Sequence, residues 1–214
     1  MRIILTLCVA YVLGSVLPAD LFARARGVDI RSIGTGNPGT SNAFQQLGLV
    51  AGLATGAYDM SVGLASMWLG SALGLSAGWM YLAGLTAVVG HCFPIFFRFR
   101  GGQGMAASAG MLLFGLGVSL ERGWLTVGGL AALAALAVGT FALTRSPNIV
   151  GLVMAPLLIA ELALGRPEWQ FALFMTVLAV WIWIVQFDLA RKRHSLRLPE
   201  PLRAAVAKMR TPMR

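Results

Sequence analysis

The sequence predicts an all-α integral membrane protein, a bundle of seven transmembrane helices. Mean hydropathy is +0.77, only 12% of the 214 residues are charged, and apolar runs of about 20 residues recur along the chain. A run of that length crosses the hydrocarbon core of a bilayer as a helix. We expect one bundle rather than two domains, because a chain of this length, mostly in spans that pack together, has room for a single core.

Seven spans follow when glycine, proline and charged residues are taken as the ends of the apolar runs. The first span begins at Arg2, whose single charge and the lack of a small-x-small cleavage site favour a retained helix over a signal peptide. A short loop around residues 74–78 separates the second span from the third, and Pro156 and Glu161 interrupt the sixth. The predicted spans are residues 2–19, 47–74, 76–97, 104–120, 123–143, 149–165 and 169–187.

The basic residues indicate the orientation of the bundle. All but three of the 17 lysines and arginines lie in the first, third and fifth predicted loops or in the tail; the exceptions are Arg2, Arg122 and Arg166. By the positive-inside rule, the N-terminus is outside and the C-terminus is cytoplasmic. We therefore expect a membrane domain over residues 1–190 and a basic cytoplasmic tail over residues 191–214.

The composition also narrows the partners and cofactors. The net charge of +9 is concentrated in the tail, so we expect anionic membrane lipids as a partner. We do not expect nucleic acid as a partner, because the sequence contains no recognised binding module for it. Cys8 and Cys92 both lie inside apolar runs, where a disulfide is not indicated. His91 and His194 lack the paired spacing of a zinc site, so we expect no metal.

Two glycine-rich segments, "SIGTGNPGTSN" (32–42) and "RFRGGQGMAAS" (98–108), lie on predicted loops of the same side. Glycines let successive backbone N–H groups point toward one anion, and the second segment also leads into a helix N-terminus. Tight turns between helices are the alternative explanation, but Arg98 and Arg100 beside the second segment favour a phosphate site. Its predicted ligands are Gly34, Gly36, Asn37, Gly39, Thr40, Ser41, Gly101, Gly102 and Gly104.

Two polar residues inside apolar runs are further candidates. Asp59 lies near the middle of the second predicted span, where a carboxylate must face the bundle or be protonated. It could serve a helix–helix hydrogen bond or a functional site. His91, at the end of the third span, could be a general base, a phosphate ligand or a donor that fixes the turn at Pro94.

The motifs in residues 14–48, 59–63 and 90–104 resemble, in order and spacing, those of the bacterial acyl-phosphate:glycerol-3-phosphate acyltransferases of the PlsY type. The resemblance implies a multi-pass enzyme of the bacterial inner membrane, with its site facing the cytoplasm and no cofactor. It would transfer a fatty acyl group from acyl phosphate to glycerol 3-phosphate, giving lysophosphatidic acid for phospholipid synthesis. The resemblance further implies that the glycine loops hold phosphate, and it suggests as catalytic residues Thr35, Asn42 and Gln103.

The chain departs from the family pattern where the family carries cations. Gln45 stands in place of an arginine, Gln103 in place of the GGKG lysine and Val62 in place of another lysine, while Thr35 replaces a serine. The family's late His-x-x-Asn has no counterpart. A neutral amide keeps a hydrogen bond but loses the charge assistance that roughly doubles its strength.

Three functions therefore stay open at the level of sequence. The chain could be an acyltransferase that uses Arg31, Arg98 or Arg100 in place of the missing cations. It could be a catalytically degenerate relative that binds lipid or a partner enzyme. It could also be an anion transporter, although the predicted spans contain no internal repeat.

Overall fold

The computed structural model describes residues 1–123 and 126–144, and further along the chain residues 153, 169, 173–174, 176–178, 180–181 and 184. Every regular element in these residues is helical, which confirms the all-α prediction. The helices are α1 (Arg2–Gly14), α2 (Pro18–Arg24), η1 (Ile30–Ser32), α3 (Thr40–Leu47), α4 (Leu49–Ala72), α5 (Ala77–Cys92), η2 (Ile95–Phe97), α6 (Met105–Glu121) and α7 (Val127–Thr144).

The predicted spans agree with the helices in the middle of the chain. The spans at 47–74, 76–97, 104–120 and 123–143 correspond to α4, α5, α6 and α7, with ends that differ by five residues or fewer. Among the described residues, Arg2–Arg24 and Ala77–Phe97 are helical stretches long and apolar enough to cross a membrane. The predicted span 149–165, most of span 169–187 and the tail 191–214 lie outside the described residues.

The first predicted span is interrupted, which corrects the expectation of one helix over residues 2–19. α1 ends at Gly14, and α2 begins at Pro18 and continues to Arg24. Leu17 is extended, with φ −116° and ψ 93°, because the proline ring that follows disfavours the helical conformation. Pro18 then starts α2 at the one helical position where its missing N–H costs nothing.

The segment predicted as the first loop contains a further helix. α3 begins directly after Gly39 and includes Thr40, Ser41 and Asn42 in its first turn. It ends at Gly48, whose φ of 90° and ψ of 179° turn the chain into α4. Only glycine adopts this conformation readily. The end of the first glycine segment is therefore a helix N-terminus.

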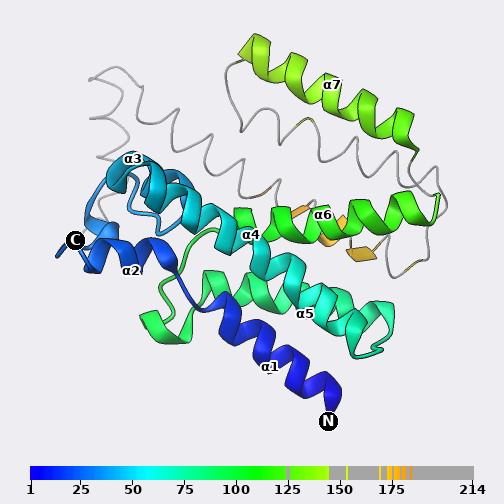
Figure 1. The fold of residues 1–214 in the computed structure, drawn as a ribbon, viewed down its shortest axis with the longest axis horizontal. Coiled ribbons are helices and arrows are strands. Elements are labelled where there is room, and N and C mark those ends of the chain that lie inside the picture. Colours follow the sequence, from blue (N-terminus) through cyan, green and yellow to red (C-terminus); the bar gives the residue numbers. More distant parts are fainter. Residues whose placement is uncertain are drawn as a thin grey trace, which may run out of the picture.

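Glycines set the distance between the central helices. A methyl group on Gly110 of α6 would collide with the Met60 carbonyl of α4, and one on Gly63 of α4 would collide with the Ala107 carbonyl of α6. Small residues at helix crossings allow backbones to approach in this way. α4 thereby packs closely on α6 and also contacts α1, α3 and α5; in Figure 1 it crosses the bundle diagonally.

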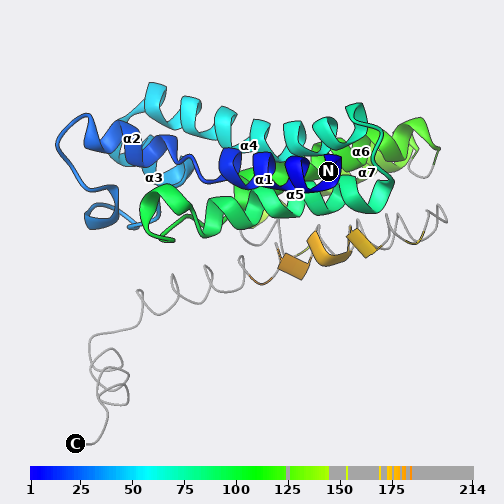
Figure 2. The same ribbon diagram turned by 90° about the horizontal axis from the view of Figure 1, so that it is seen from below.

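Both glycine segments lie at one end of the bundle, beside α2 and α3 (Figure 1). Figure 2 shows the same end from a second direction, with the long helices running away from it. Side chains of α1 and its C-terminal turn fix the second segment there. Tyr11 Oη donates to the Phe93 carbonyl at 2.7 Å, and Ser15 Oγ accepts from Ile95 N at 3.4 Å. The break after α1 thus anchors the chain that leads into the second segment.

Candidate functional site

Asn42 organises the first glycine segment. Its side chain is 1% exposed, and its Oδ1 accepts from the Thr35 amide at 2.9 Å. Its Nδ2 donates to the carbonyls of Ile30 and Ile33 at 3.2 and 3.1 Å. Asn42 therefore holds the backbone of the loop from inside, and a catalytic contribution of this residue stays a prediction.

The second glycine segment is folded back on the end of α5. Gly101 N donates to the Cys92 carbonyl at 3.1 Å, and Gly102 N donates to the His91 carbonyl at 3.0 Å. A methyl group on Gly101 would collide with both acceptors, so only glycine fits there. Gly104, in the left-handed conformation with φ 70°, then leads into α6.

The two segments meet at His91. A methyl group on Gly102 would collide with His91 Nε2 and would lie 3.5 Å from Asn37 Oδ1. Asn37 belongs to the first segment and Gly102 to the second. The imidazole of His91, which is 4% exposed, thus lies directly under the junction of the two loops.

Asp59 lies behind His91, inside the bundle. Its Oδ1 is 3.6 Å from His91 Nδ1, and the carboxyl side chain is 1% exposed. Among the described residues, this oxygen has no hydrogen-bond partner. The prediction that Asp59 faces the bundle is confirmed, and the contact joins α4 to the histidine beneath the loops.

The other predicted site residues occupy less constrained positions. Thr35 is exposed, and its Oγ1 accepts from the Asn37 amide at 3.4 Å. Ser41 is exposed and lies 3.5 Å from the amide nitrogen of Gln45. Thr40 Oγ1 is buried without a hydrogen-bond partner among the described residues. Gln103 is half-buried on the second segment.

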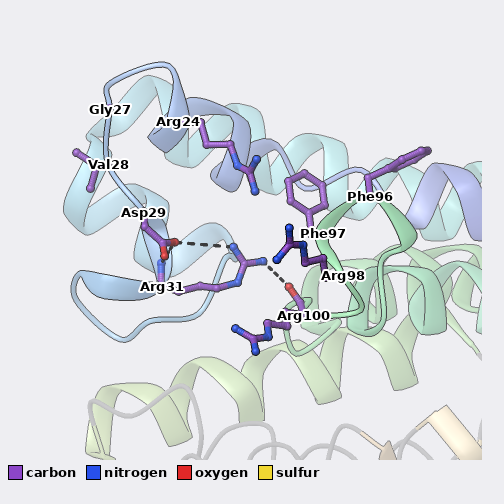
Figure 3. Close-up of a pocket in the computed structure, with 9 residues that line it drawn as sticks. All are labelled: Arg24, Gly27, Val28, Asp29, Arg31, Phe96, Phe97, Arg98 and Arg100. Carbon is purple, nitrogen blue, oxygen red and sulfur yellow. Dashed lines mark hydrogen bonds and ion pairs between the residues drawn. The ribbon is translucent and has the colours of Figure 1, made fainter.

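A cationic pocket of about 610 Å³ lies beside the glycine segments. Figure 3 shows that four arginine side chains extend into this region from two parts of the chain, the end of α2 with the following loop and the turn after η2. Arg98 and Arg100 were predicted site residues, and Arg31 was a predicted substitute cation. Sequence analysis missed the other lining residues, which are Arg24, Gly27, Val28, Asp29, Phe96 and Phe97.

Arg31 connects the pocket to both glycine segments. Its guanidinium forms an ion pair with Asp20, which is 2% exposed, and donates to the Arg100 carbonyl next to the second segment. The Arg31 carbonyl lies under the first segment, 3.0 Å from where a methyl group on Gly36 would be. Partial burial and the neighbouring charge of Arg100 lower the pKa of Arg31 from its ordinary value.

Replacing Asn42 by alanine should destabilise the protein by about 2 kcal/mol or more, because three backbone groups lose their partner. Asn42→Asp should be similarly harmful, since a carboxylate oxygen would then face the Ile30 and Ile33 carbonyls. Thermal unfolding in detergent measures the effect. Gln45→Ala, one turn further along α3 and exposed, is the matched control and should change stability by no more than about 0.5 kcal/mol. Equal melting temperatures for the Asn42 and Gln45 variants would contradict the conclusion that Asn42 holds the loop.

Comparison with known proteins identifies the family. The family model described as glycerol-3-phosphate acyltransferase matches residues 4–193. Glycerol-3-phosphate acyltransferase 1 of Deinococcus radiodurans is 40% identical over 183 residues, covering 83% of this chain and 86% of the relative. A glycerol-3-phosphate acyltransferase of Thermus thermophilus is 35% identical over 193 residues, covering 88% of this chain and 90% of the relative.

A solved structure shares the fold. The crystal structure of PlsY, an integral membrane glycerol 3-phosphate acyltransferase, in its glycerol 3-phosphate form superimposes with a TM-score of 0.74. The superposition covers 93% of this chain and 95% of that one, at 22% sequence identity. The architecture is therefore that of an integral membrane protein. Together with the family match and the relatives, the resemblance predicted from the motifs is confirmed: the chain belongs to the glycerol-3-phosphate acyltransferase family.

Proposed function

We propose that this protein transfers a fatty acyl group from acyl phosphate to glycerol 3-phosphate, producing lysophosphatidic acid and phosphate. The acceptor hydroxyl oxygen attacks the acyl carbonyl carbon, the bond from that carbon to the phosphate oxygen breaks, and the hydroxyl proton passes to the released phosphate. Acyl phosphate is already activated, so the reaction needs no metal or other cofactor. Positioning and stabilisation of charge supply the rate.

The meeting of the two glycine segments at His91 is the observation that carries this proposal. Asn37 and Gly102 come together over the imidazole of His91, so the backbone amides in the first turns of α3 and α6 can surround one phosphate. Such a cradle holds the leaving phosphate without a cation. The amides of Gly101 and Gly102 hold the second segment on α5 instead, because they donate to the carbonyls of Cys92 and His91. Thr35 and Gln103, on the two segments, stay the predicted catalytic residues, with Asn42 fixing the loop from inside.

The proposed enzyme is a seven-span protein of the bacterial inner membrane. Its membrane domain covers residues 1–190, with the N-terminus outside, the site at the cytoplasmic face and the basic tail 191–214 in the cytoplasm. The distribution of arginine and lysine supports this orientation. Anionic lipids are the expected partner of the tail, and nucleic acid is not a partner.

The neutral residue Gln103 suggests a direct test of activity. Purified protein incubated with acyl phosphate and labelled glycerol 3-phosphate should form lysophosphatidic acid, and Gln103→Lys should raise kcat/KM about tenfold, because a charged donor strengthens the bond to phosphate. Ser71→Lys adds the same charge at the opposite, exposed end of α4 and should have no effect.

A catalytically degenerate relative is the second candidate, favoured by the neutral residues Gln45 and Gln103. In that case the natural chain forms no product above the protein-free background, and activity appears only after Gln103→Lys. Product formation by the natural chain excludes this alternative.

A further inference from the structure

The arginines of the pocket form two pairs with different environments. We call Arg24 and Arg31 the inner wall because both make an ion pair with the buried Asp20, although their own side chains are 64% and 23% exposed. Arg24 also lies over the ring of Phe97, 5.2 Å from its centroid. These contacts fix the two inner guanidinium groups in place, so the positive charge of this wall is preorganised.

The outer pair, Arg98 and Arg100, has no such neutralising partner. Within residues 1–123 and 126–144, no carboxylate forms an ion pair with either side chain. Among the described residues Asp29 is the one carboxylate that lines the pocket, and its Oδ1 accepts from the Arg31 amide at 3.0 Å as the cap of η1. Four arginines against two carboxylates, the exposed Asp29 and the buried Asp20, leave this region with a net positive charge.

The backbone that presents the outer pair is strained. Arg98 and Phe99 have φ values of 53° and 60°, in the left-handed region that side chains other than asparagine and aspartate rarely adopt. Two hydrogen bonds hold this turn, from Phe99 N to the Pro94 carbonyl at 2.9 Å and from Arg100 N to the Phe97 carbonyl at 3.1 Å. Strain of this kind, about 1 to 3 kcal/mol per residue, is typical of functional sites.

We propose that this pocket binds a phosphate monoester, and, building on the proposed function, that it holds the phosphate of glycerol 3-phosphate. That phosphate is retained in lysophosphatidic acid, so the pocket binds the same group before and after transfer. Arginine suits this ligand because its planar guanidinium donates to two phosphate oxygens at once.

The two anion sites then have separate tasks. Each substrate carries one phosphate. The glycine segments hold the phosphate of acyl phosphate, which is released in the reaction and changes its position little. The acceptor is a dianion and needs cations, which Gln45 and Gln103 do not supply. The pocket supplies them from Arg98 and Arg100 of the second segment, with Arg31 held beside them by its hydrogen bond to the Arg100 carbonyl. The chain thus keeps a charged acceptor site at a different place from the family's usual lysine.

Binding of glycerol 3-phosphate alone tests this inference. We would titrate the full-length protein in detergent by calorimetry, without acyl phosphate, and compare the double variant Arg98→Asn/Arg100→Gln. Asparagine is chosen because it tolerates the left-handed backbone of Arg98. Affinity should fall at least roughly tenfold in the double variant. Arg2→Gln, which removes one charge at the far end of α1, is the control and should bind normally.

Further binding measurements distinguish a free phosphate monoester from a lipid headgroup as the ligand of the pocket. Inorganic phosphate should compete with glycerol 3-phosphate and glycerol should not, since the phosphate is the recognised group. Nanodiscs containing anionic phosphatidylglycerol or only phosphatidylcholine test whether a lipid headgroup occupies the pocket instead. One result would overturn the inference: phosphatidylglycerol binding that depends on Arg98 and Arg100, together with glycerol 3-phosphate binding that is equal in all variants. That result would indicate that a lipid headgroup is the ligand of the pocket.

The inference and the proposed function can fail separately. Undiminished binding of glycerol 3-phosphate by a folded double variant, or no binding by the natural chain, refutes the pocket assignment. Arginine-dependent binding without acyl transfer refutes the proposed function and leaves the pocket assignment intact. To exclude misfolding, the melting temperature of each variant is measured, and Arg98→Lys/Arg100→Lys, which keeps the charges, should retain part of the affinity.

Discussion

Replacing Gly110 by leucine should lower the free energy of unfolding by about 3 kcal/mol and the melting temperature by roughly 6 to 12 °C. Gly110 of α6 lies against the Met60 carbonyl of α4, at a point where even a methyl group has no space. The obstacle is backbone, which cannot rotate away, so the two helices must separate. Separation also disturbs the reciprocal contact of Gly63 with the Ala107 carbonyl.

Gly117 offers a matched control on the same helix. It is exposed, and no atom of the described residues lies within 4 Å of where its methyl group would be. Gly117→Leu should therefore leave stability unchanged or raise it by a few tenths of a kcal/mol to about 1 kcal/mol, since leucine is the better helix former. Thermal unfolding of both variants in the same detergent gives the comparison. If the two leucines have equal effects, the close crossing of α4 and α6 is wrong.

Gly101→Ala should reduce acyl transfer by about 100-fold while the protein stays folded. The methyl group would meet the carbonyls of His91 and Cys92, which accept the hydrogen bonds from Gly102 and Gly101. The second segment must then move away from His91, and a displacement of about 1 Å at a reacting centre costs about this factor. Initial rates at saturating acyl phosphate measure the loss.

Gly78→Ala is the control for that variant. Gly78 lies in the first turn of α5, at the opposite end from His91, and in the part of the chain that the structure describes no atom lies within 4 Å of its methyl position. The rate of acyl transfer by the Gly78→Ala variant should equal that of the natural chain. A Gly101→Ala enzyme with normal rates would show that activity does not require contact between the second segment and the end of α5. The proposed phosphate site at the two glycine segments would then be wrong.

The helices of the middle of the chain were predictable because their signals are local. α4 starts after Gly48 and α5 after the turn at residues 73–76, and hydropathy places such ends within a few residues. The break after α1 was also visible in the sequence, at Pro18, but the apolar run continued past it. α3 was missed because eight residues of mixed polarity carry no membrane signal.

Only part of the candidate site could be predicted from neighbouring residues in the sequence. The glycine segments were recognisable, since clusters of glycine between apolar runs are rare and the motifs resemble a known family. The hydrogen bonds by which Asn42 holds the loop could not be recognised in the sequence, because its partners Ile30 and Ile33 lie 12 and 9 residues earlier in the chain. The pocket was missed for the same reason: Arg31 and Arg100 are 69 residues apart and meet only in the folded bundle.

The sequence by itself determined the class of protein, the helices of its centre, the family and the loss of the usual cations at Gln45 and Gln103. These depend on composition, periodicity and motifs, which are properties of neighbouring residues. Tertiary structure alone decided that the two glycine segments meet at His91 and that four arginines share one pocket. Both outcomes depend on contacts between segments that lie far apart in the chain, such as the one from Arg31 to the Arg100 carbonyl, and no single segment sets the distances between them.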